Sequence, residues 1–66
     1  MFTKKEMVIL SLIASGLTSK KIALHLHLSI DTIKTHRKNI IKKAKSRGLI
    51  FDSLLRLAIQ MKENSK

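Results

Sequence analysis

Helix-capping residues recur along this chain, and they constrain its fold more than any other feature. Thr3 and Glu6 have the spacing of a capping box, in which each side chain satisfies a backbone N–H group that the helix leaves free. Thr18 and Ser29 stand as N-cap residues before two further segments, whose apolar residues recur at the helical period. No segment shows the alternation of a strand, so the sequence predicts an all-α fold.

The ends of the helices are also marked. The chain has no proline and two glycines, and Gly16 stands where the first helix should stop, because glycine readily adopts the positive φ of a C-terminal cap. Gly48 ends the third helix, and Asp52 or Ser53 can cap a fourth. We expect one domain over residues 1–66, with helices at about residues 4–15, 19–26, 30–46 and 53–62.

The helical period also predicts the core. A domain of this length buries only about 60% of the surface that its unfolded chain exposes, so the core is small. On the third helix the residues expected to face inward are Ile33, His36 or Arg37, Ile40, Ile41 and Ala44. The apolar residues of the other three helices are Ile9, Leu10, Leu12, Ile13, Leu17, Ile22, Ala23, Leu26, Leu54, Leu55, Leu57, Ala58 and Met61.

Length and composition exclude several classes of protein. The absence of cysteine excludes a disulfide framework and a thiolate metal site. The longest apolar run, Met7 to Leu10, falls far short of the ~18 residues that span a bilayer, and no secretory signal precedes it. We therefore expect a cytoplasmic protein. A chain of 66 residues also leaves little room for an enclosed enzyme cleft, so we expect that it is not an enzyme.

Positive charge is concentrated in the middle of the chain. The net charge is +10, from 14 Lys and Arg against 4 Asp and Glu. Residues 31–50 contribute +6 of this, because they hold seven basic residues and a single acid, Asp31. A surface that serves only solubility usually mixes both signs, so this concentration predicts a surface that binds a polyanion.

The second and third helices are joined by a very short link. Only two or three residues separate Leu26 from the third helix, and a link of that length makes the two helices cross steeply. Like charges four residues apart on a helix repel by about 0.2–0.5 kcal/mol per pair, so a row of lysines makes sense where a polyanion neutralises it. The outer face of the third helix carries four such lysines and one threonine, in a row formed by Lys34, Thr35, Lys38, Lys42 and Lys45.

One family combines these features at the same positions. The pattern runs without a gap over residues 2–43, about two-thirds of the chain. Its first part is Phe2-Thr3-x-x-Glu6-x-x-Ile9-Leu10-x-Leu12-Ile13-Ala14-x-Gly16-Leu17-Thr18-x-Lys20-x-Ile22-Ala23-x-x-Leu26. Its second part is Leu28-Ser29-x-x-Thr32-Ile33-Lys34-x-His36-x-x-Asn39-Ile40-x-x-Lys43. On these residues the chain resembles the LuxR/FixJ-type (GerE-like) helix-turn-helix domains of bacterial transcription regulators.

This resemblance implies a four-helix fold that binds double-stranded DNA in a sequence-specific way, with the third helix in the major groove. The positions that contact base edges fall on Lys34, Thr35 and Lys38. Lysine can donate to guanine O6 and N7, and threonine can hydrogen-bond or press its methyl group against that of thymine. The positions that contact the DNA backbone fall on Thr18, Lys20, Thr32 and Lys42, and we add His36, Arg37 and Lys45 as further candidates.

The resemblance also implies partners besides DNA. In this family the fourth helix often forms a homodimer contact, and RNA polymerase is a further expected partner. The match weakens after Lys43, where Ala44-Lys45-Ser46-Arg47 precede Gly48 as if the third helix continued by about one turn. The family commonly carries a receiver or ligand-binding domain in front, so a free-standing protein and the effector part of a larger regulator both stay open.

The composition also raises a membrane or acidic-protein partner and a metal site as alternatives. A basic amphipathic module could bind an anionic membrane or an acidic protein, but such modules tend to form one continuous helix, unlike this capped series. His25 and His27 lie two residues apart and would point in different directions on a helix, with no cysteine to complete a metal site. We therefore expect no metal, no cofactor and no membrane partner.

Overall fold

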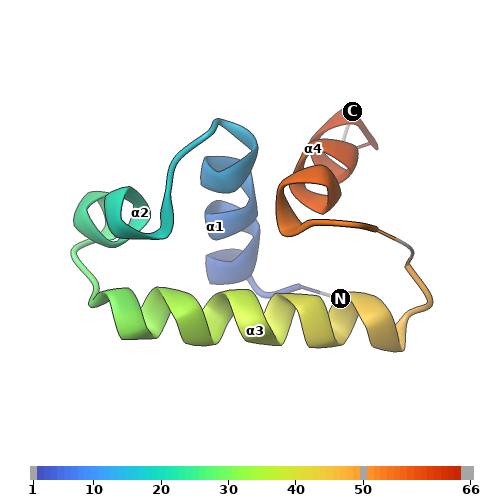
Figure 1. Cartoon of the computed structure of the whole chain (residues 1–66), viewed down its shortest axis with the longest axis horizontal. Helices are drawn as coiled ribbons and strands as arrows, with labels where there is room; N and C mark the ends of the chain where they lie inside the picture. Colours follow the sequence, from blue (N-terminus) through green and yellow to red (C-terminus); the bar gives the residue numbers. More distant parts are fainter. Residues whose placement is uncertain (1, 50, 65–66) are drawn as a thin grey trace.

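The structure is a computed structural model that describes residues 2–49 and 51–64, with side chains as far as residue 61 (Figure 1). Its described residues form four helices and no strand, so the all-α prediction is confirmed. The helices are α1 (Lys4–Ala14), α2 (Ser19–Leu26), α3 (Ile30–Ser46) and α4 (Leu54–Asn64). The longest, α3, lies along one side of the molecule, and the other three helices lie together on its opposite side (Figure 1).

Side-chain caps begin the helices where the sequence predicts them. The capping box of α1 is complete, since the Thr3 N–H donates to Glu6 Oε1 at 2.9 Å and the Glu6 N–H donates to Thr3 Oγ1 at 3.1 Å. Thr18 Oγ1 accepts from the Lys21 N–H at 3.3 Å at the start of α2. Ser29 Oγ accepts from the Thr32 N–H at 3.2 Å and so begins α3.

Three of the predicted helix boundaries, one in α1 and two in α4, are wrong by one or two residues. The first helix ends at Ala14 rather than residue 15, because Gly16 turns the chain with a φ of 94°. The N–H groups of Gly16 and Leu17 then donate back to Ile13 O and Leu12 O, at 2.9 and 3.1 Å, which is a Schellman motif.

The fourth helix starts at Leu54 rather than residue 53 and continues to Asn64 rather than 62. Ser53 acts as its cap, because Ser53 Oγ accepts from the Arg56 N–H at 3.2 Å. The other candidate, Asp52, instead forms an exposed ion pair with Arg56 at 3.6 Å.

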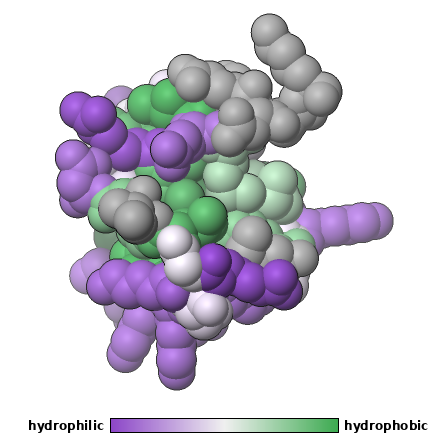
Figure 2. Space-filling view, turned by 90° about the vertical axis from the view of Figure 1, so that its right-hand side faces the viewer, coloured by the Kyte–Doolittle hydropathy of each residue, from purple (hydrophilic) through white to green (hydrophobic). Residues whose placement is uncertain are grey.

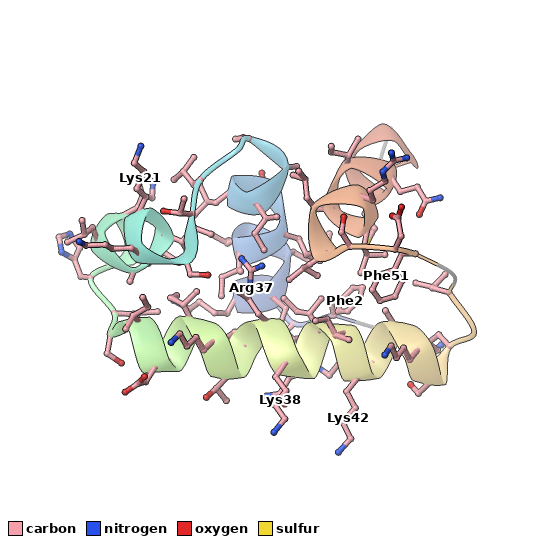
Figure 3. The ribbon with its side chains drawn as sticks, in the orientation of Figure 1. Phe2, Lys21, Arg37, Lys38, Lys42 and Phe51 are labelled. Atoms are coloured by element: carbon pink, nitrogen blue, oxygen red, sulfur yellow. The ribbon has the colours of Figure 1, made fainter. Side chains whose placement is uncertain are left out.

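The core lies where α1 meets the other helices. Ile9, Ile22, Ile33 and Ile40 are fully buried, and they come from α1, α2 and α3. Phe2 and Phe51 lie between α3 and α4 and cover the core from that side (Figure 3). The full set of buried apolar residues is Ile9, Leu10, Ile13, Ile22, Ala23, Ile33, Ile40, Ala44, Leu54, Leu57 and Ala58. None of the helices over residues 2–49 and 51–64 is long and apolar enough to cross a membrane.

Two of the apolar residues of α4, Leu55 and Ile59, lie outside the core. Leu55 is 46% exposed and Ile59 is 40% exposed. The inner face of α4 is formed instead by Leu54, Leu57 and Ala58. A residue directly after Leu54 lies about 100° further around the helix and so leaves the core.

A buried carboxylate joins the start of α1 to the second half of α3. Glu6 is 4% exposed, and its Oε1 lies 2.7 Å from Lys43 Nζ, which donates to it. The hydrogen bond from Lys43, aided by the backbone N–H of Thr3, holds the pKa of Glu6 below its ordinary value of 4.5, although burial acts in the opposite direction. The carboxylate is therefore ionised at neutral pH and fixes the two helices against each other.

We expect Glu6→Gln to lower the free energy of unfolding by about 1–3 kcal/mol at pH 7, because a charged hydrogen bond to Lys43 is lost. A group whose pKa is lowered by folding contributes stability above its unfolded pKa and loses it as the pH falls through the folded pKa. The difference between the two proteins should therefore shrink below pH 4.5 and vanish in stronger acid. Urea unfolding followed by circular dichroism from pH 2 to 7 measures it, and a difference independent of pH contradicts this role.

We expect Ser29→Ala to lower the free energy of unfolding by about 1 kcal/mol, because the first turn of α3 loses its N-cap. Ser29→Asn is the matched control, since asparagine also supplies a side-chain oxygen and should stay close to the parent protein. Equal stability of the alanine and asparagine variants in urea would show that the cap contributes nothing.

Candidate nucleic-acid interface

The turn between α2 and α3 fixes the angle between these helices. His27 follows α2 in the left-handed region, with φ 56° and ψ 41°, and the Leu28 N–H donates back to Ala23 O at 2.9 Å. Ser29 then caps α3 directly, so the chain changes direction between α2 and α3 within three residues. The steep crossing predicted from the short link follows from this turn, and α2 and α3 form a helix-turn-helix unit (Figure 1).

The inner face of α3 is an apolar row. Ile33, Ile40 and Ala44 have no exposed surface, because they pack into the core under the other helices. Burial of this row fixes the rotation of α3 about its own axis. The opposite face of the same helix must therefore point away from the molecule.

That outer face carries the predicted DNA-contacting residues of α3. At about 100° per residue, five positions share an arc of roughly 100° on the side away from the core. Figure 3 shows Lys38 and Lys42 extending from α3 away from the other helices. The whole outer row is exposed, and its members are Lys34, Thr35, Lys38, Lys42 and Lys45.

Thr35 has part of its hydrogen-bonding capacity occupied within the helix. Its Oγ1 donates to the backbone carbonyl of Asp31 at 3.0 Å, so the hydroxyl proton is directed back along α3. The methyl group and the oxygen lone pairs are left for a ligand. Of the two base contacts that the sequence suggests for Thr35, this geometry favours contact with a thymine methyl.

The two threonines expected at the DNA backbone both lie at helix starts, Thr18 as the cap of α2 and Thr32 in the first turn of α3. Thr18 Oγ1 caps α2, and Thr32 Oγ1 lies 2.9 Å from Ser29 Oγ at the start of α3. Thr18 is exposed and Thr32 is half-buried at the edge of the outer face of α3. Both hydroxyls can still accept or donate one further hydrogen bond, so capping and phosphate contact are compatible.

The adjacent lysines of α2 point in different directions. Figure 3 shows Lys21 extending away from α3 and from the side on which Lys38 and Lys42 lie. Lys20 is also exposed and lies about 100° further around α2. The arrangement favours Lys20 over Lys21 as the lysine of α2 that approaches a ligand of α3.

Arg37 does not lie on the outer row. Figure 3 shows its side chain extending from α3 toward α1 and α2, on the side opposite to Lys38 and Lys42. It is half-buried and lines a cleft of about 340 Å³. The other residues lining this cleft are Ile13, Gly16, Leu17, Thr18, Ser19 and Leu55. His36, the residue before Arg37, is also half-buried.

Helix α3 runs to Ser46, so it is long enough to carry Lys45 on its last turn. Arg47 follows as its C-terminal cap, and Gly48 ends the helix with a φ of 77°. The expected extension by about one turn beyond Lys43 is confirmed. Lys45 is exposed and continues the outer row toward its C-terminal end.

One contact that supports α3 joins residues far apart in the sequence. Lys43 lies outside the outer row, half-buried, and its charge is directed at Glu6, 37 residues earlier in the chain. Both residues belong to the family pattern, which was the available signal, but nothing in their spacing shows that they touch. Lys43 thus supports α3 and does not add to its exposed positive charge.

The described residues include no group of three or more His, Cys, Asp or Glu side chains that could hold a metal ion. His25 and His27 are both exposed, at the end of α2 and in the turn that follows. The outer row consists of exposed lysines and one threonine, side chains that can donate hydrogen bonds to anions and to base edges.

Comparison with known proteins agrees with this geometry. Residues 1–50 match the family described as "Bacterial regulatory proteins, luxR family". The chain is 56% identical over 41 residues to the uncharacterized response regulatory protein YgeK of Escherichia coli (strain K12), covering 62% of this chain and 28% of that protein. It is 49% identical over 43 residues to the response regulator protein VraR of Staphylococcus aureus, covering 65% of this chain and 21% of that protein.

The chain thus spans about a quarter of the length of these relatives. No solved structure matches the chain. The family match covers α1, α2 and the whole of α3, which is the part of the fold that holds the helix-turn-helix unit and the outer row. The chain therefore belongs to the luxR family of bacterial regulatory proteins, a family of DNA-binding transcription regulators.

Proposed function

We propose that this chain binds double-stranded DNA in a sequence-specific way, with α3 in the major groove, and so regulates transcription. The observation that carries this proposal is the exposed outer row of α3, which stands opposite its fully buried inner row. A major groove about 12 Å wide admits one α-helix, and this is the one helix of the unit whose long basic face is unobstructed. Binding to DNA would place the protein in the bacterial cytoplasm.

The first half of α3 is proposed to contact bases. Lys34 and Lys38 can donate to O6 and N7 of guanine, and the Thr35 methyl can contact that of thymine. These three side chains are exposed and lie within about one turn of the helix, so they can reach neighbouring base pairs together.

The contacts to phosphates are proposed to surround this base-reading segment. Lys42 and Lys45 extend the outer row toward the end of α3, while Thr18 and Lys20 lie at the start of α2. Thr32 and His36 flank the outer row on one side. Arg37 would approach a phosphate only from the side of α2, through the cleft that it shares with Thr18.

A homodimer formed through α4 would place two recognition helices on a two-fold operator. The support is that Leu55 and Ile59, four residues apart on α4, are exposed apolar side chains on one face of that helix. Seen from the right-hand side of Figure 1, the molecule shows hydrophobic surface in its middle and hydrophilic side chains along its lower edge (Figure 2). RNA polymerase is proposed as a further partner on the strength of the family alone.

We expect Lys34→Ala and Lys38→Ala each to weaken binding to the preferred duplex by about 1–3 kcal/mol, and to weaken binding to random duplex by less, because base contacts are lost along with one charge. Lys21→Ala is the matched control, since it removes the same charge from a side chain that points away from this face. Fluorescence anisotropy with both duplexes over a range of salt concentrations measures the effects.

Selection of bound sites from random duplexes supplies the preferred sequence for these measurements. Equal losses on both duplexes for Lys34→Ala and Lys38→Ala would remove base reading from the proposal. Tight binding to anionic vesicles, together with no binding to any duplex, would favour the membrane-binding alternative and overturn the proposed function.

We expect Ile59→Gln to reduce cooperative binding to paired half-sites by about tenfold while leaving the affinity for a single half-site unchanged, because the exposed apolar face of α4 is interrupted. Leu24→Gln is the matched control, since Leu24 is 70% exposed on α2. Titration of duplexes carrying one or two half-sites measures the effect. Full cooperativity in the Ile59 variant would exclude α4 as the dimer contact.

A further inference from the structure

The outer face of α3 contains one acidic side chain among its lysines. Asp31 is the only acid among residues 31–50, and it is the second residue of α3 after the Ser29 cap. Its side chain is exposed. A carboxylate on the face proposed to meet a polyanion needs a physical explanation.

The helical period places Asp31 on the row itself. Lys38 and Lys42 follow Asp31 by seven and eleven residues, which brings each back to within about 20° of it around the helix. Figure 3 shows both lysines pointing away from the molecule, so Asp31 begins the same line of side chains. It precedes Lys38 by about 10 Å along the helix axis.

The carboxylate of Asp31 is not engaged elsewhere in the part of the chain that the structure describes. Ser29 supplies the side-chain cap of α3, and Thr35 bonds only to the backbone carbonyl of Asp31. The ion pairs found over the described residues are those of Glu6 and Asp52. The two oxygens of Asp31 are therefore free to accept hydrogen bonds from a ligand.

An ionised carboxylate can only accept hydrogen bonds, so it cannot bind a phosphate and is repelled by it. In the major groove it finds a complementary donor in the N4 amino group of cytosine. Facing guanine O6 and N7 or thymine O4 it is left desolvated and unpaired, and at adenine the N7 acceptor beside the N6 amino group repels it. The carboxylate therefore weakens binding to sequences that lack cytosine at this position and leaves binding to those that have it unaffected. An unfavourable interaction of this kind creates specificity.

We propose that Asp31 is a specificity-determining residue, which selects cytosine at one base pair of each half-site by accepting from its N4 amino group. The proposal rests on the proposed function, since it requires α3 to lie in the major groove. It adds a base reader at the start of α3, ahead of Lys34, Thr35 and Lys38 on the same face. A negative charge in the first turn also favours the helix dipole, and that role predicts an effect on stability alone.

The test compares Asp31→Ala and Asp31→Asn with the parent chain by selection from random duplexes and by titration of single-base variants of the selected site. The parent should show a cytosine preference of about 5- to 10-fold at one position. Asp31→Ala should abolish it, and Asp31→Asn should transfer it to adenine, whose N6 and N7 an amide can bind together. Both variants should bind random duplex on the order of two- to fivefold more tightly at low salt.

Asp52→Asn is the matched control, because it makes the same change of charge at an exposed residue before α4, away from α3. It should leave the base preferences unchanged. Identical base preferences in all four proteins, with equal gains in affinity for Asp31→Asn and Asp52→Asn, would overturn the proposal and leave Asp31 as a residue of the helix dipole. In that case the parent still binds its site through Lys34 and Lys38, whereas failure of the parent to select any duplex would overturn the proposed function itself.

Discussion

Burial of one narrow row on α3 is the constraint on which the rest of this interface depends. Ile33 and Ile40 have no exposed surface, and each contributes about 1.5–3 kcal/mol by leaving water. Together they outweigh the single charged hydrogen bond from Lys43 to Glu6, worth about 1.5–3 kcal/mol. Packing therefore sets the rotation of α3, and the ion pair restrains its second half. The basic row faces outward as a consequence of what is buried behind it.

The local features of the fold could be predicted from the sequence because each depends on residues close together in the chain. Thr3, Thr18 and Ser29 cap helices with their own side chains, and Gly16 supplies a positive φ that few residues tolerate. The left-handed turn at His27 gave no such signal, since glycine or asparagine usually occupies that conformation. The contact of Glu6 with Lys43 could not be predicted from the sequence either, because it depends on how α1 crosses α3.

The part of the candidate site that follows from the helical period of α3 could be predicted from the sequence. The outer face of α3 follows from the same spacing that defines its buried face, so the exposure of Lys34, Lys38 and Lys42 could be anticipated. Arg37 shows the limit of that reasoning. Its position borders the apolar row, and a long cationic side chain there can extend along the protein surface in more than one direction. Only the packing of α1 and α2 around it shows that it turns into the cleft beside Thr18.

The length of α3 has a consequence for how such a regulator can change. Its 17 residues extend about 25 Å, roughly twice the width of the groove that a recognition helix enters. On the proposed mode of binding, its first turns and its last turns would meet different parts of a duplex. Substitutions near the start would then retarget the protein to another operator, while substitutions near the end would change how long it stays on any DNA. Selection can act on the two properties separately, although a single rigid element carries both.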